Sequence, residues 1–176
     1  PVFSCQLSQD SELHKKKLQG KKILEVKLDG VRAISILYPN GNVNIFSRNG
    51  KELHNFDNIK NELKRSIMDK PIRTALVLDG EIVSKNFQEL MKQIYRKNNI
   101  QNNDATLYLF DILSLDSFKK GFEKISQKNR IENLGSWYQE YLKGNSFIKL
   151  LEQKIIDFNT NQGLKEFNNF NHNSVH

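Results

Sequence analysis

The residues best suited to chemistry lie in the run Glu25-Val26-Lys27-Leu28-Asp29-Gly30-Val31-Arg32. A neutral lysine amine can attack phosphorus when burial or a neighbouring cation lowers its pKa. Lys27 stands between two apolar residues, and Arg32 follows an Asp-Gly turn, so Lys27 is our candidate nucleophile. Glu25 is two residues away and shares the same strand face. The alternative is a solvated strand-turn-strand whose charges face water.

Two acids interrupt a second apolar run, Leu78-Asp79-Gly80-Glu81-Ile82-Val83. Burying a carboxylate is costly unless it is paired or hydrogen-bonded. Glu81 could therefore accept hydrogen bonds from ribose hydroxyls or help to hold Mg²⁺. The alternative is an exposed Asp-Gly turn at a strand end, which the apolar flanks make less favourable.

Two further segments carry candidate binding residues. Phe110 precedes an acid in the apolar run Tyr108–Leu113, where an aromatic ring could stack on a nucleobase or simply pack in the core. Arg48 lies in Ser47-Arg48-Asn49-Gly50, at a strand end just before a turn. Its guanidinium could bind a phosphate, or it could be an ordinary surface arginine.

Strands and helices alternate along the chain in the pattern of an α+β protein with mixed sheets. Hydrophobic periodicity predicts helices around Phe56–Ile67 and Ile131–Tyr141, a helix beginning at Asn86 and a last one beginning at Gly163. We expect a polar connection between Leu113 and the helix around Ile131–Tyr141. Residues 168–176 lack hydrophobic periodicity. The predicted strands are 22–27, 31–37, 43–47, 74–83, 106–113, 147–151 and 155–158, with a hairpin turn at Pro39-Asn40-Gly41.

Composition narrows the possible classes. The 176 residues fit one domain, and the net charge of +7 favours a polyanionic partner such as nucleic acid, although solubility alone could explain it. Cys5 is the only cysteine, which excludes a disulfide framework and a thiolate metal site within this chain. We find no apolar run of membrane-spanning length, and we expect a cytoplasmic protein.

The order KLDGVR, SRNGKEL, VLDGEIV and YLFDIL resembles the covalent nucleotidyltransferase superfamily. This superfamily includes ATP-dependent DNA ligases, RNA ligases and mRNA capping enzymes. Within it, the chain is most similar to the adenylation domain of small phage or bacterial ATP-dependent DNA ligases. The resemblance implies an α+β, ATP-grasp-like fold of mixed, largely antiparallel sheets flanked by helices.

The resemblance also implies roles for individual residues. Lys27 would attack the α-phosphate of ATP to form lysyl-AMP, and Arg32 would contact the sugar and phosphate. Glu25 would lie near the adenine edge, Glu81 would bind the ribose hydroxyls, and Phe110 would stack on adenine. Arg48 would contact the 5′-phosphate of the nick, and Asp79 would be structural or linked to a metal. The implied cofactors are ATP and Mg²⁺, with no metal ligand assigned.

The implied activity is sealing of nicked double-stranded DNA in repair, replication or recombination, by a monomer in a bacterium or phage-infected host. The family's later EG-x-x-x-K and K-x-K elements are absent, so we expect residues 1–176 to be a partial adenylation domain without its C-terminal OB-fold domain. Self-adenylation could then be weak. The alternatives are an RNA ligase, a capping guanylyltransferase, or a noncatalytic module that binds nucleotide or DNA.

Overall fold

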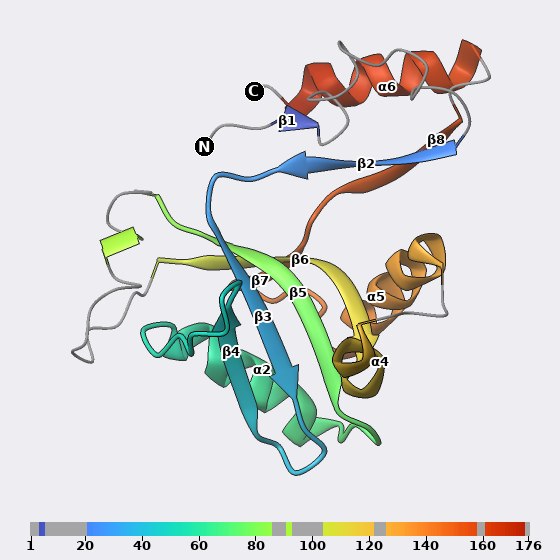
Figure 1. The fold of residues 1–176 in the computed structure, drawn as a ribbon. Helices are drawn as coiled ribbons and strands as arrows, with labels where there is room; N and C mark the ends of the chain where they lie inside the picture. Colours follow the sequence, from blue (N-terminus) through green and yellow to red (C-terminus); the bar gives the residue numbers. More distant parts are fainter. Residues whose placement is uncertain are drawn as a thin grey trace. The chain divides into compact units, whose positions relative to one another are not determined.

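The computed structural model describes residues 4–5, 21–85, 91–92, 104–121, 126–157 and 161–174. The chain divides into two compact units, one of residues 30–150 and one of residues 1–29 with 151–176. The larger unit contains β3 (Val31–Leu37), β4 (Val43–Ser47), α2 (Asp57–Asp69), β5 (Leu76–Val83), β6 (Thr106–Ser114), α4 (Leu115–Lys120), α5 (Gln127–Tyr141) and β7 (Ile148–Leu150) (Figure 1). The smaller unit contains β1 (Ser4–Cys5), β2 (Lys21–Lys27), β8 (Gln153–Asp157) and α6 (Asn161–Ser174).

The larger unit is built on a five-stranded sheet in the order β4-β3-β5-β6-β7. All neighbouring strands are antiparallel except β6 and β7, which run parallel. The predicted α+β class with mixed, largely antiparallel strands is therefore confirmed. The predicted hairpin is also present: the Tyr38 and Asn42 backbones close the turn with a 2.9 Å hydrogen bond, and Gly41 adopts φ 92°.

Two helices pack against this sheet and contribute side chains to its hydrophobic core. α2 contacts β3 and β4, and α5 contacts β6. Ile59, Leu63 and Ile67 recur every four residues on α2 and are buried, as the helical period requires. On α5 the Tyr138 hydroxyl donates a 2.6 Å hydrogen bond to the backbone oxygen of Ile148, which ties the helix to β7. Both helices follow the sequence prediction.

β5 confirms the predicted strand across its two acids and excludes the alternative of an Asp-Gly turn at a strand end. The Asp79-Gly80-Glu81 segment does not break the strand, which runs without interruption through residue 83. Instead the register with β6 shifts between Asp79 and Gly80. The strand can continue because Gly80 has no side chain: a Cβ there would lie 2.4 Å from the backbone oxygen of Tyr108. Close backbone approach, and not a turn, is therefore the reason for this glycine.

Other sequence predictions need correction. The expected polar connection after residue 113 contains α4, a short helix that Ser114 caps by accepting a hydrogen bond from the Ser117 backbone. Gly121 ends this helix in the left-handed conformation. The aperiodic tail predicted from Asn168 is helical as far as Ser174. α6 contacts β1 and β8, and such packing overrides the weak helix propensity of asparagine. The helix predicted from residue 86 lies outside the described residues, except for 91–92.

The smaller unit holds a three-stranded sheet in the order β1-β2-β8, with antiparallel pairing. Ser4 pairs with Lys27, and Glu25 pairs with Gln153. The Asp-Gly turn between Lys27 and Arg32 does not join two strands of one sheet, because β2 and β3 belong to different sheets. Among the described helices, none is long and apolar enough to cross a membrane.

Candidate functional site

Arg32 and Glu81 meet on one face of the five-stranded sheet. They are directly opposite each other in the β3–β5 ladder, and Asp79 lies two residues before Glu81 on the same face. The residues that flank Arg32 on β3 alternate in burial, with Ala33, Ser35 and Leu37 turned into the core. The sheet thus presents a cation and two carboxylates on the face opposite its buried side chains.

Arg32 and Asp79 form a forked ion pair. The Arg32 Nε donates to the Asp79 carboxylate at 3.0 Å, and its Nη2 donates to the second carboxylate oxygen. The Arg32 side chain is 43% exposed, whereas Asp79 is only 15% exposed. Hydrogen bonding to Asp79 raises the pKa of Arg32 above its ordinary value; burial opposes this, and the charges of Asp79, Glu81 and Asp111 add to the rise. Arg32 therefore remains a cation throughout the working range of pH.

Phe110 joins this group because of the irregularity in β6. On β6, Asp111 pairs with Asp79 and Leu109 pairs with Gly80, so Phe110 has no partner opposite it. An extra residue of this kind re-aims a side chain next to many functional sites. The Arg32 guanidinium carbon lies 5.9 Å from the centre of the Phe110 ring, within range of a cation–π contact. The sequence predicted Phe110 as a site residue but not the bulge that places it.

A second ion pair, which the sequence did not predict, lies beside the bulge. The Arg130 Nε donates to Asp111 Oδ1 at 2.9 Å. The two side chains are 18% and 20% exposed, so the pair is largely shielded from water. The available signal was the acid within the apolar run of β6, because a carboxylate in such a place needs a partner.

Arg48 follows β4 at the end of the sheet that also carries Arg32, since Ser47 pairs with Ala33. The turn after β4 is closed by hydrogen bonds from Gly50 N to Ser47 O at 2.9 Å and from Ser47 N to Lys51 O at 2.7 Å. Arg48 is exposed within this turn. The predicted position at a strand end before a turn is confirmed; its predicted contact with a phosphate stays a prediction.

Lys27 and Glu25 belong to β2 of the smaller unit. Lys27 is the last residue of that strand, and Gly30, three residues later, begins the larger unit. A Cβ on Gly30 would lie 2.3 Å from the backbone oxygen of Ile82 and 3.0 Å from Val83 Cγ2. Gly30 therefore allows the chain to lie against β5 as it enters the larger unit, which explains the glycine of the KLDGVR run.

The group on the sheet face can bind a planar, hydroxylated anion. Phe110 offers a ring for stacking, Glu81 a carboxylate acceptor, and Arg32 a guanidinium that can bind oxygen atoms of a phosphate or sugar. These chemical types fit a nucleotide. For Mg²⁺ the fit is weaker, because the described residues contain no cluster of three or more His, Cys, Asp or Glu side chains. A magnesium ion commonly takes one or two carboxylates together with substrate phosphates.

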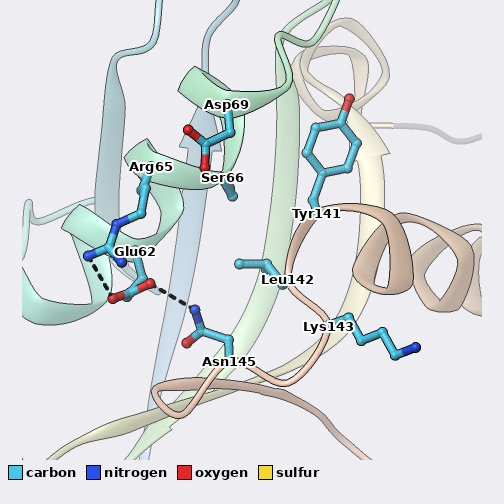
Figure 2. A pocket seen from close by; sticks show the side chains of 8 residues that line it. All are labelled: Glu62, Arg65, Ser66, Asp69, Tyr141, Leu142, Lys143 and Asn145. Carbon is cyan, nitrogen blue, oxygen red and sulfur yellow. Dashed lines mark hydrogen bonds and ion pairs between the residues drawn. The ribbon is translucent and has the colours of Figure 1, made fainter.

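A polar pocket of about 150 Å³ lies elsewhere in the larger unit (Figure 2). Its lining comes from α2 and from the end of α5 with the turn that follows: Glu62, Arg65, Ser66, Asp69, Tyr141, Leu142, Lys143 and Asn145. Glu62 accepts a 2.9 Å hydrogen bond from Asn145 and pairs with Arg65 at 3.1 Å. Asn145 in turn accepts hydrogen bonds from the backbones of Phe147 and Ile148. These groups bind one another, so we assign the pocket a structural role.

Comparisons with known proteins place the chain in a defined group. A family model described as "ATP dependent DNA ligase domain" matches residues 4–172. A DNA ligase of African swine fever virus is 31% identical over 107 residues, which are 60% of this chain and 25% of the viral protein. A DNA ligase of Ignicoccus hospitalis is 31% identical over 129 residues, which are 66% of this chain and 21% of that protein.

Solved structures show a likeness to ligases as well. A structure named Pmar-Lig_PreS3 covers 99% of this chain at 42% identity and a TM-score of 0.86, and the match spans 40% of that protein. The ATP-dependent DNA ligase of bacteriophage T7, in complex with ATP, covers 87% of this chain and 54% of its own length, at 20% identity and a TM-score of 0.60. The latter likeness concerns the fold alone. The chain spans a quarter or less of the curated relatives that it matches.

Proposed function

This chain belongs to the family of ATP-dependent DNA ligase domains, and from that membership we propose that it binds ATP and becomes adenylated on Lys27. The resemblance predicted from the four sequence motifs is confirmed at the level of the family and of its fold. One structural observation carries the proposal: Arg32, Glu81 and Phe110, which are far apart in the sequence, gather on one face of a sheet.

In the proposed reaction, the Lys27 amine attacks the α-phosphorus of ATP after losing a proton. A phosphorus–nitrogen bond forms, the bond from the α-phosphorus to its bridging oxygen breaks, and pyrophosphate leaves. Phe110 stacks on the adenine and Glu81 accepts hydrogen bonds from the ribose hydroxyls. Arg32 contacts the sugar and phosphate, and Glu25 lies near the adenine edge. Fixing the nucleotide in this way lowers the barrier because the reacting atoms no longer need to find one another.

We further propose that Mg²⁺, bound through the triphosphate of ATP, would supply positive charge that offsets the charge of the phosphoryl group; none of the described residues is assigned as its ligand. In a second stage the adenylate passes to the 5′-phosphate of a nick in double-stranded DNA, which Arg48 contacts. The 3′-hydroxyl then displaces AMP. The net charge of +7 supports such a polyanionic substrate. We also propose that the chain acts as a monomer in the repair or replication of DNA, in the cytoplasm of a bacterium or of a phage-infected host.

The first experiment tests covalent labelling. The 176-residue chain is incubated with α-labelled ATP and Mg²⁺, and protein-bound label is measured after denaturation. We expect an acid-labile label that is lost in Lys27→Ala. Lys21→Ala, at the other end of the same strand, provides the matched control and keeps the label.

A label that survives in Lys27→Ala would rule out Lys27 as the nucleophile. If no label forms while ATP still binds, the chain is a noncatalytic nucleotide-binding module. Labelling by GTP in place of ATP would indicate a capping guanylyltransferase. With a labelled chain, transfer of AMP to nicked RNA but not to nicked DNA would indicate an RNA ligase.

A further inference from the structure

The bulge that presents Phe110 brings two carboxylates directly opposite each other. Asp79 on β5 pairs in register with Asp111 on β6, immediately beside the unpaired Phe110. Like charges at opposite positions of an antiparallel ladder repel each other. Without compensation, this repulsion would push β5 and β6 apart at the point where Phe110 must be held.

Each of these carboxylates has its own arginine. Arg32 from β3 binds Asp79, and Arg130 from α5 binds Asp111 at 2.9 Å. The oxygen of Asp111 that receives Arg130 also accepts the backbone N–H of Ile112 at 2.9 Å. The Asp111 side chain is thereby fixed between the helix and its own strand. β7 pairs with β6 only at residues 107–109, so Arg130 contacts β6 where that pairing has ended.

Arg130 also lies near the N-terminus of α5, the end of a helix that disfavours a positive charge. It lies in the first turn of α5, which begins at Gln127, and its backbone N–H bonds to the oxygen of Ser126, the capping residue. The helix dipole is positive at this end and disfavours an arginine. The ion pair with Asp111 compensates for this placement. The cap at Ser126 and the start of the helix hold the arginine backbone in one position.

We propose that Arg130 is a positioning residue for the nucleotide base: by holding Asp111, it fixes the bulge of β6 that aims Phe110. It acts through Asp111 and Phe110 without touching the nucleotide. This inference depends on the proposed nucleotide site at Phe110. It predicts that Arg130 governs affinity for the base of ATP and leaves affinity for the phosphates unchanged.

The test uses Arg130→Met, which keeps the aliphatic stem and removes the charge, in the 176-residue chain. Arg65→Met is the matched control, because Arg65 also pairs with a carboxylate of the same unit but is 67% exposed. Dissociation constants are measured for ATP and for inorganic tripolyphosphate. We expect Arg130→Met to weaken ATP binding about five- to tenfold, as loss of an aromatic stacking contact does, with tripolyphosphate unchanged. Arg65→Met binds both ligands like the wild type.

Two further measurements separate positioning from a general loss of stability. In the double variant Arg130→Met with Phe110→Ala, ATP affinity is no weaker than in Phe110→Ala alone. The backbone amide of Ile112 exchanges its hydrogen faster in Arg130→Met, with or without nucleotide. Arg130→Lys, which keeps a cation near Asp111, recovers part of the ATP affinity and serves as the informative variant if Arg130→Met does not fold.

Equal losses of ATP and tripolyphosphate binding, or wild-type affinity in Arg130→Met, would overturn this inference. So would additive effects of the Arg130 and Phe110 substitutions, because they would show that the two residues act separately. If Phe110→Ala itself binds ATP like the wild type, the proposed nucleotide site fails, and the positioning role fails with it. The Phe110→Ala result thus identifies which of the two ideas is wrong.

Discussion

Replacing Gly80 by alanine tests whether the close backbone approach of β5 and β6 at this glycine holds the site together. Gly80 lies between Asp79 and Glu81, at the register shift opposite the Phe110 bulge. An added Cβ would lie 2.4 Å from the backbone oxygen of Tyr108 and 3.0 Å from Leu107 Cδ1. The nearer atom belongs to the backbone of the neighbouring strand, so a change of rotamer cannot relieve the clash.

The expected cost follows from the movement that is needed. An ordinary contact requires β5 and β6 to separate locally by about 1 Å. Overpacking of this kind costs about 1–3 kcal/mol, and a ladder hydrogen bond weakened by the separation adds about 1 kcal/mol. We therefore expect Gly80→Ala to lower the free energy of unfolding by about 2–4 kcal/mol, a large part of the stability of a typical domain.

Urea unfolding followed by circular dichroism measures this change, provided that the slope of the transition is unchanged. Gly135→Ala is the matched control, because Gly135 is in α5 and a Cβ there would meet nothing within 4 Å. An alanine inside a helix should stabilise the protein by about 0.5–1 kcal/mol. A Gly80→Ala variant as stable as the wild type, or a shift of both alanine variants in the same direction, would contradict close backbone packing at Gly80.

The remaining predictions concern the ion pair and the buried tyrosine of the larger unit. In a double-mutant cycle of Arg32→Gln and Asp79→Asn, we expect a coupling of about 1 kcal/mol in unfolding, kept small by the exposure of Arg32; no coupling would contradict the forked pair. Tyr138→Phe removes the hydrogen bond to Ile148 and should cost about 1 kcal/mol in the same assay. Burial raises the pKa of the Tyr138 hydroxyl in the folded state. The contribution of the neutral hydroxyl to folding stability is therefore fully present below the pKa of tyrosine in the unfolded chain, about 10, and is lost as the pH rises through the pKa of the folded state. The urea midpoint of the wild type should therefore fall at alkaline pH more steeply than that of Tyr138→Phe, and parallel curves would contradict this.

The local pattern of residues was sufficient to predict most of the elements. The apolar, β-branched run of β3, the alternation of β4 and the four-residue spacing of Ile59, Leu63 and Ile67 in α2 reflect fixed geometries of strand and helix. Those patterns predicted the hairpin and the two longer helices of the larger unit, α2 and α5, but not the short helix α4. They failed for the end of α6, whose asparagines have little helix propensity, because contacts with β1 and β8 decide its conformation.

The sequence by itself predicted the candidate residues Lys27, Arg32, Arg48, Glu81 and Phe110, in motifs whose order is typical of the family that the comparisons confirmed. Of these, the larger unit brings Arg32, Glu81 and Phe110 together. Only the tertiary structure decided how they are held. Pairing of distant strands places Arg32 opposite Glu81, and the bulge turns Phe110 toward Arg32. The Arg130–Asp111 pair joins residues 19 positions apart on a helix and a strand. Such contacts depend on register and close backbone approach, which a local pattern of hydrophobicity does not encode.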